Sequence, residues 1–363
     1  MDLATTMMWP FLASLVLAGI HVYLGIHVIA RKVIFVDLAL AQIAALGAIC
    51  GVLLGYHIDT DPWAVKGFSL AFGVAGAALF SITRMRHERV PHEAVIGIVY
   101  AVALASTILA TSRLAHGAQE VQDLLAGSIL WVRAETVIST ALLYALVGAW
   151  HWRYRRRLLL ISSDPETAED EGINVRLWDF FFYVSFGVVV TSSVAVAGVL
   201  LVFSFLVIPA VVAVLFADGL GRRLAIGWSV GSVVSLAGLV VSYRSDLPSG
   251  PTVVACFAAV LAAAGLVHYM QQAAAKGPAM RRVAVGLLAV AVAGWGLTLL
   301  EKEDRHGALE RLASTVKNER LAVLRQALVD EAVWVEISPG VAHAARDAEP
   351  EVREAFCLLV AER

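Results

Sequence analysis

The side chains in this sequence that could do chemistry are few, and most are types that bind metal ions. His57, Asp59 and Asp61 form an H-x-D-x-D run, which offers the imidazole and carboxylate ligands that divalent cations accept. Two further histidines, His21 and His27, are six residues apart, or about 600° of helical rotation, so they point to different sides of a helix and cannot form one chelate alone. The H-x-D-x-D run is therefore the leading candidate for a cation site, with a solvated loop as the alternative.

The sequence lacks the motifs of common catalytic and nucleotide-binding sites. It contains no G-x-x-x-x-G-K-[ST] phosphate loop, no H-E-x-x-H pair and no C-x-x-C pair. The three cysteines, Cys50, Cys256 and Cys357, are far apart and are interpreted as small apolar fillers. We expect no enzymatic activity, no permanently bound cofactor and no nucleic acid partner. Any ATP hydrolysis must therefore occur in a separate subunit.

The elements that must position these side chains are membrane-spanning helices. Of the 363 residues, 59% are hydrophobic and only 16% are charged, and the mean hydropathy is +0.77, which is too apolar for a soluble fold. A span needs about 20 mostly apolar residues. Candidates lie near 8–30, 34–56, 63–83, 93–113, 134–152, 178–197, 198–217, 223–243, 251–272 and 282–300. The predicted fold is an all-α, polytopic transmembrane bundle of about nine or ten spans.

The longest apolar run extends from Phe180 to Ala217. We divide it near Gly198, since two antiparallel helices fit a run of that length and one does not. Pro209 lies inside the second helix, where it frees a backbone carbonyl and marks a break or kink. Gly198 and Pro209 together predict a bent helix that lines a path through the membrane.

Basic residues predict the orientation. Those that fall in alternate connections, which the positive-inside rule makes cytoplasmic, are Arg31, Lys32, Arg84, Arg86, Arg89, Arg153, Arg155, Arg156, Arg157, Arg176, Arg222, Arg223, Lys276, Arg281 and Arg282. The other connections hold only Lys66, Arg113, Arg133 and Arg244. The N-terminus is therefore expected outside the cell. With ten spans, the C-terminal tail lies outside as well.

The longest and most polar cytoplasmic connection within the bundle, 162–176, predicts a short amphipathic helix. Asp164 suits the N-cap, Pro165 the first helical position, and Glu166 the first turn, where an acid faces the positive end of the helix dipole. Gly172 suits the C-terminal stop. A helix below the membrane is what an ATPase subunit needs as a lever, and an ordinary loop is the alternative. The predicted coupling residues are Asp164, Pro165, Glu166, Ala168 and Gly172.

Four stretches, in this order, resemble the integral membrane permeases of the zinc, manganese and iron ABC importers. They are R-K-V-I-F-V-D-L-A-L-A-Q-I-A-A-L-G at 31–47; V-P-H-E-A-V-I-G-I at 90–98 with L-L-A-G-S-I-L at 124–130; D-P-E-T-A-E-D-E-G-I-N-V at 164–175 with A-G-V-L-L-V-F-S-F-L-V-I-P-A at 197–210; and S-Y-R-S-D-L-P-S-G-P at 242–251. The resemblance runs from about Gly25 to Val267.

The resemblance implies a fold like that of type II ABC importers and a place in the plasma membrane of a prokaryote. It implies a homodimeric permease, surrounded by lipid, that works with cytoplasmic ATPase subunits and an extracytoplasmic metal-binding protein. The transported zinc, manganese or iron ion is then a substrate.

The resemblance also implies metal ligands within the membrane. The family has an acid and a histidine one helical turn apart on the second span, and Asp37 and Gln42 lie nearest to those positions. A neutral amide is a poor ligand for these ions, and Asp37 is one residue out of the usual register. Asp37 could instead be an interfacial helix cap. Glu93, at the start of the fourth span, is interpreted as a first-turn acid on its own helix dipole.

Two other kinds of transporter are alternatives. The nearest is an ABC permease for a metal chelate such as haem, a siderophore or cobalamin, which the replacement of a histidine by Gln42 keeps open. A secondary cation transporter should show acids in mid-membrane and internal repeats. The sequence shows no convincing repeat, which favours power from ATP.

The domain boundary is predicted between 300 and 301. Residues 1–300 form the permease domain, and residues 301–363 form a small soluble tail with apolar residues at helical spacing. Its last segment resembles a HEAT-type repeat helix, with Pro350 at its start and Val352, Phe356 and Leu359 on one face. One or two such hairpins cannot bury a core alone, so the tail is expected to pack on another surface.

Overall fold

The computed structural model describes residues 3–56, 60–84, 90–113 and 129–273. All regular structure in these ranges is helical, which confirms the predicted all-α class. The elements are α1 (Leu3–Ala30), α2 (Val36–Leu53), α3 (Pro62–Thr83), α4 (His92–Thr111), η1 (Ile129–Trp131), α6 (Ala134–Arg153), α7 (Arg155–Ser163), α8 (Pro165–Asp170), α9 (Val175–Ala197), α10 (Val199–Phe216), α11 (Leu220–Ser245) and α12 (Ser249–Gln272).

Eight helices in the described part of the chain are long and apolar enough to cross a membrane. They are α1, α2, α3, α4, α9, α10, α11 and α12. The helix α6, which covers the predicted span 134–152, has 20 residues and ends in Trp150, His151, Trp152 and Arg153, and it is not among these eight. The predicted tenth span, 282–300, and the tail, 301–363, lie outside the described residues. The domain boundary at 300 therefore stays a prediction.

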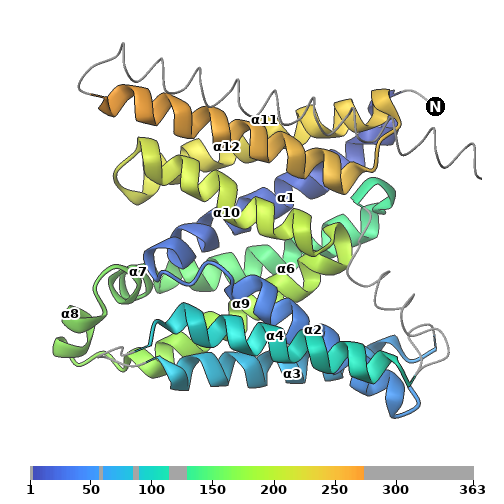
Figure 1. Cartoon of the computed structure of the whole chain (residues 1–363), viewed down its shortest axis with the longest axis vertical. Coiled ribbons are helices and arrows are strands. Elements are labelled where there is room, and N and C mark those ends of the chain that lie inside the picture. The colour runs from blue at the N-terminus through green and yellow to red at the C-terminus, as the bar shows by residue number, and fades with distance from the viewer. Residues whose placement is uncertain (1–2, 57–59, 85–89, 114–128, 274–363) are drawn as a thin grey trace, which may run out of the picture. The chain divides into compact units, whose positions relative to one another are not determined.

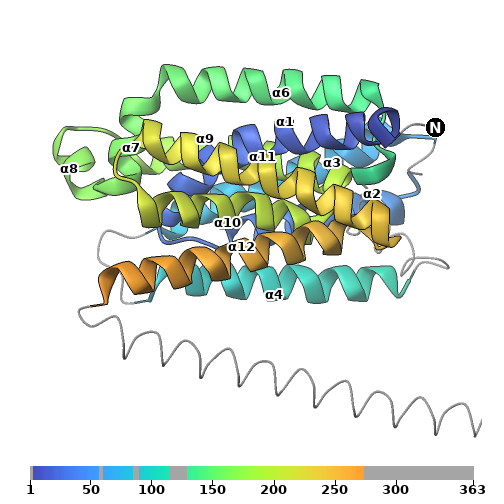
Figure 2. The ribbon, with the colours of Figure 1, turned by 90° about the horizontal axis from the view of Figure 1, so that it is seen from above.

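The helices pack in two groups with α9 and α6 between them (Figure 1). One group is α2, α3 and α4, and α9 lies against α2 and α3. The other group is α1, α10, α11 and α12, and α6 lies against α1. Seen from above in Figure 2, α6 and α4 lie on opposite outer faces of the bundle. Both carry exposed aliphatic side chains, among them Val102, Leu109, Leu142 and Leu146, which is the surface that a bundle embedded in lipid presents.

The chain divides between α9 and α10 at Gly198, as predicted. Gly198 has φ +78° and ψ 159°, a backbone conformation that side-chain-bearing residues rarely adopt. The helix α10 then runs back toward the end of the bundle where α9 began (Figure 1). It continues through Pro209 as one helix, so the break in this apolar run lies at Gly198 and not at Pro209. Pro209 is buried next to Gly227 and Gly231 of α11.

Four of the basic residues that the positive-inside rule assigned to the cytoplasm lie together at one end of the bundle. Arg31 and Lys32 of the α1–α2 connection, Arg84 after α3 and Arg176 at the start of α9 all line one cavity. The short helices α7 and α8 lie at the same end, opposite the N-terminus (Figure 1). This arrangement agrees with the predicted orientation, and this end is called the cytoplasmic end below.

Candidate functional site

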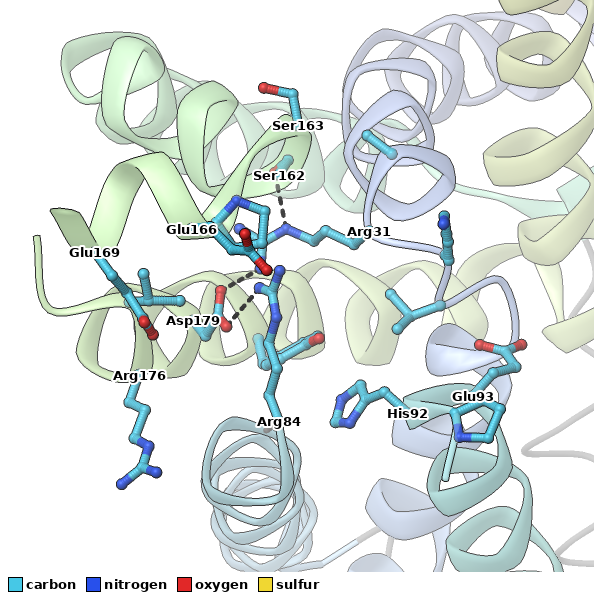
Figure 3. Close-up of a pocket in the computed structure, with 17 residues that line it drawn as sticks. Arg31, Arg84, His92, Glu93, Ser162, Ser163, Glu166, Glu169, Arg176 and Asp179 are labelled. Atoms are coloured by element: carbon cyan, nitrogen blue, oxygen red, sulfur yellow. Dashed lines mark hydrogen bonds and ion pairs between the residues drawn. The ribbon is translucent and has the colours of Figure 1, made fainter. Parts of the chain in front are cut away.

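A cavity of about 470 Å³ lies at the cytoplasmic end of the bundle. Its walls come from the ends of α1, α3 and α4, from α7 and α8, and from the first turns of α9 (Figure 3). The lining is unusually charged, with arginine and lysine side chains facing glutamate and aspartate side chains. The predicted coupling residues Pro165 and Glu166 are among the lining residues, so the sequence-predicted lever borders this cavity.

One buried carboxylate, Asp179 of α9, holds two arginines at the wall of the cavity. Its Oδ1 accepts a hydrogen bond from Nη1 of Arg31, which follows α1, and the pair is an ion pair. Its Oδ2 lies 2.6 Å from Nη1 of Arg84, which follows α3. Figure 3 shows dashed lines from the Asp179 carboxylate to both guanidinium groups. A carboxylate buried in this way requires such partners, because an unpaired buried charge is strongly unfavourable.

The guanidinium group of Arg31 is held from several sides. Its carbon atom Cζ lies 3.9 Å from the centre of the Phe182 ring, a cation–π contact. Its Nε donates a hydrogen bond of 2.8 Å to the hydroxyl oxygen of Ser162, at the end of α7. Nη2 is buried and has no hydrogen-bond partner among the described residues. The guanidinium group of Arg31 therefore contacts both α7 and α9.

The hydroxyl of Ser162 joins α1 to α7. It donates to the carbonyl oxygen of Leu158 at 2.7 Å and lies 2.8 Å from Nδ1 of His27. Because a hydroxyl has one hydrogen, Nδ1 of His27 must be the protonated nitrogen and donate to Ser162. Arg84 adds a link, since its Nη2 donates to the carbonyl oxygen of Ile161 at 3.3 Å. The ends of α1 and α3 therefore both contact the last turn of α7.

The predicted helix in the 162–176 connection exists as α8. Asp164 is its N-cap, and its carboxylate accepts hydrogen bonds from the backbone N–H of Thr167 at 3.1 Å and from the Thr167 hydroxyl at 2.5 Å. These two hydrogen bonds hold the pKa of Asp164 below its ordinary value. The bond from the Thr167 hydroxyl has the larger effect, and the bond from the Thr167 backbone N–H has the smaller one. Pro165 occupies the first helical position, as predicted.

The other end of α8 closes in a Schellman motif. Gly172 has φ +77°, its N–H donates to the carbonyl oxygen of Glu169 at 2.9 Å, and the N–H of Ile173 donates to that of Ala168 at 3.0 Å. The side chain of Ala168 is fully buried against Ile161 of α7 and Val175 of α9. The segment α7, α8 and the start of α9 is therefore one packed unit.

Comparison with known proteins shows which family the chain belongs to. Residues 4–268 match the ABC 3 transport family, which is most of the chain. The chain belongs to the ABC 3 transport family. It is a multi-pass permease of the plasma membrane, and the resemblance drawn from its sequence is confirmed.

Two curated relatives are each similar to about two thirds of this chain. The chain is 26% identical over 249 residues to the "Manganese transport system membrane protein MntC" of Listeria innocua, which is 68% of this chain and 87% of that protein. It is 27% identical over 250 residues to the "High-affinity zinc uptake system membrane protein ZnuB" of Haemophilus influenzae, which is 68% of this chain and 92% of that protein.

A solved structure shares the fold. It is described as "PsaBC from Streptococcus pneumoniae in complex with Fab", with a TM-score of 0.58 and 20% sequence identity, and the likeness covers 71% of this chain and 90% of that chain. The chain therefore shares the fold of this structure.

Asp37 and Gln42, the candidate metal ligands of the second span, both lie buried in α2. Their exposed fractions are 2% and 4%. Five residues of α-helix turn the chain by about 500°, so the two side chains do not share one face. Asp37 lies in the first turn of α2, and the N-cap position is occupied by Phe35. Oδ1 of Asp37 and Oε1 of Gln42 are buried without partners among the described residues.

The three residues of the H-x-D-x-D run are only partly placed. His57 and Asp59 lie outside the described residues. Asp61 lies at the N-cap position of α3, where its Oδ2 accepts a hydrogen bond from the hydroxyl of Thr60 at 2.8 Å, and its side chain makes no cap bond. Among the described residues, no group of three or more His, Cys, Asp and Glu side chains could hold a metal ion.

The membrane histidines are bound in polar contacts inside the bundle. Nδ1 of His21 hydrogen-bonds the carbonyl oxygen of Leu17 at 2.8 Å, and its Nε2 lies 3.1 Å from the hydroxyl oxygen of Ser193. His27 is committed to Ser162, as described above. Neither contacts Asp37 or Gln42 by a hydrogen bond in the described part of the chain. Both histidines therefore pack as polar residues inside the bundle, each beside a serine hydroxyl.

Glu93 lies in the first turn of α4, as predicted, and has a second role. Its carboxylate accepts the backbone N–H of Phe35 at 2.9 Å, so it serves the start of α2 and not only its own helix.

Sequence reasoning missed Asp179. An acid inside an apolar span is by itself a sign of function, and Asp179 follows Trp178 within a predicted span. That signal was available in the sequence, but the identity of its two partners was not.

Proposed function

We propose that this member of the ABC 3 transport family is the permease subunit of an ATP-driven importer of a divalent transition metal ion, namely zinc, manganese or iron. The observation that carries the proposal is the match over 4–268 together with relatives named for manganese transport and zinc uptake. The ion is the substrate of the permease. The permease forms a homodimer and receives the ion from an extracytoplasmic binding protein.

Energy comes from a separate cytoplasmic ATPase subunit that pushes on α8. Two features support this assignment. The helix has a complete cap at each end, through Asp164 and Gly172, so it keeps its shape when loaded. Ala168 ties it to α7 and α9, so a push on α8 reaches the bundle. The coupling residues are Asp164, Pro165, Glu166, Ala168 and Gly172.

The ion enters at the outer mouth and crosses beside α2 and α10. His57, Asp59 and Asp61 are the proposed ligands at the mouth. Asp37 and Gln42 each have a buried oxygen without a partner among the described residues, which supports a place where a passing cation replaces the missing contact. Gly198 and Pro209 shape the path-lining helix.

The test is uptake by the permease reconstituted in proteoliposomes with its ATPase subunit and binding protein. Zn²⁺, Mn²⁺ and Fe²⁺ are offered singly, with haem and cobalamin as chelate controls. Accumulation of one divalent ion, with ATP hydrolysis that it stimulates and that Asp37→Ala abolishes, is the expected result. Asp218→Asn, at an exposed acid of the α10–α11 connection, is the matched control. Stimulation by a chelate alone would overturn the proposal in favour of a chelate permease.

A further inference from the structure

Asp179 lies on the element that continues directly from the lever. It sits one turn into α9, which begins at Val175, and Val175 packs against Ala168 of α8. The hydroxyl of Ser81 in α3 also donates to the backbone oxygen of Arg176 at 2.6 Å. The first turns of α9 therefore contact both α8, which is the proposed lever, and α3.

The two arginines that Asp179 holds belong to different groups of helices. Arg31 ends α1, which packs with α10 and α11, whereas Arg84 ends α3, which packs with α2. The two groups contact each other through α9 and between α2 and α10, and at the cytoplasmic end this carboxylate binds an arginine from each group. A change in the position of Asp179 must therefore move both groups or break an ion pair.

We propose that Asp179, together with Arg31 and Arg84, transmits the displacement of α8 to α1 and α3. The inference rests on the proposed function, because it assumes an ATPase that displaces α8. Asp179 is a positioning residue in this scheme: it touches neither the ion nor ATP, and it acts through the two arginines.

The two ion pairs of Asp179 are costly to separate, so a movement of Asp179 should carry Arg31 and Arg84 with it. Each carboxylate oxygen serves one arginine, and the side chain of Asp179 is fully buried, as is that of Arg31. Separation of either pair would leave a buried charge without a partner, which is strongly unfavourable. The contacts therefore resist extension and pass a displacement on.

Arg31, Arg84 and Asp179 also share a cavity with two acids of α8. The cavity has a volume of about 470 Å³, and the two acids are Glu166 and Glu169 of the lever. A displacement of α8 therefore changes the position of two carboxylates that share the cavity with Arg31, Arg84 and Asp179.

The experiment compares uptake with ATP hydrolysis in the reconstituted complex, with Mn²⁺ and Zn²⁺ as probes. Arg84→Gln is the first variant, because it removes the α3 link and leaves the neutral Arg31–Asp179 pair to support folding. Asp179→Asn is the second, and Asp179→Glu restores the charge. We expect ions transported per ATP hydrolysed to fall about tenfold in Arg84→Gln and Asp179→Asn, and to recover at least in part in Asp179→Glu.

Folding and assembly are controlled in the same preparations. Size-exclusion profiles and copurification with the ATPase subunit measure assembly, and Asp218→Asn repeats the Asp-to-Asn change at an exposed site of the same face. An unchanged ratio of transport to hydrolysis in assembled Arg84→Gln overturns the inference, and so does a loss of uptake that only follows a loss of assembly. If Asp179→Asn does not assemble, the Arg84→Gln result decides. Failure of the proposed function looks different, since the wild-type complex would then transport neither ion.

Discussion

The carboxylate of Glu93, in the first turn of α4, accepts the backbone N–H of Phe35, the residue that precedes α2, at 2.9 Å. In a capping box, a glutamate three residues into a helix reaches back to the N-cap N–H of the same helix. Here a glutamate of another helix does so. The starts of α2 and α4 are thus fixed to each other at the cytoplasmic end.

Glu93→Ala is expected to destabilise the permease by about 1 kcal/mol, because the N–H of Phe35 loses its acceptor. Glu93→Gln keeps an oxygen that can accept this hydrogen bond and should lose less. Thermal unfolding of the purified protein in detergent measures both. Equal losses in the two variants would show that the charge matters and the hydrogen bond does not.

Asp164→Ala should weaken association with the ATPase subunit severalfold, since α8 loses its N-cap. Asp164→Ser, which can still accept the N–H of Thr167, should retain most of the affinity. Pull-down of the ATPase subunit at graded concentrations gives the comparison. If Asp164→Ala binds as tightly as the wild type, α8 does not need its cap for docking.

The same carboxylate predicts a pH dependence. Because the folded-state pKa of Asp164 is lowered, the cap stabilises α8 above the ordinary aspartate pKa and loses this effect only as pH falls through the lowered value. The difference in ATPase association between wild type and Asp164→Ala should therefore be constant from about pH 6 to 8. A difference that fades within that range would contradict the assignment of Asp164 as the ionised cap.

Gly25→Ala should be among the most damaging small changes in the membrane region. A Cβ at Gly25 would collide with the backbone oxygen of Leu206 in α10 and lie 2.9 Å from the Cβ of Ala210, so α1 and α10 would have to move apart. We expect a loss of about 3 kcal/mol, seen as a lower midpoint of thermal unfolding. Gly19→Ala, in the same helix with nothing within 4 Å of the added Cβ, should be neutral or stabilising. Similar unfolding midpoints for the two variants would mean that α1 and α10 leave enough space at Gly25 for a methyl group.

Gly198→Ala tests the break between α9 and α10. At φ +78° and ψ 159° an alanine is strained by about 2 kcal/mol, so the chain should lose stability and metal uptake together. Gly187→Ala, also in α9, places its Cβ at an ordinary 3.7 Å from Leu40 and serves as the control. Uptake and unfolding midpoint are measured on the same preparations, and a wild-type midpoint in Gly198→Ala would show that the break tolerates a side chain.

The parts of the site that the sequence predicted correctly are those whose conformation depends on a few neighbouring residues. Asp164, Pro165 and Gly172 define α8 because caps act over three or four residues of chain. Glu93 was assigned to its own helix for the same reason, since nothing in the sequence near it points to Phe35. The metal ligands stay predictions at Asp37 and Gln42, and His57 and Asp59 lie outside the described residues.

The sequence by itself determined the membrane location, the helical class, the capped helix α8 and the break at Gly198, because hydropathy, helix capping and backbone preference are local properties. Only the tertiary structure decided what Asp179 does. Its partners Arg31 and Arg84 lie 148 and 95 residues away in the chain, and each reads in isolation as one more cytoplasmic positive charge. Pairing over such separations depends on how the helices pack, which no local pattern encodes.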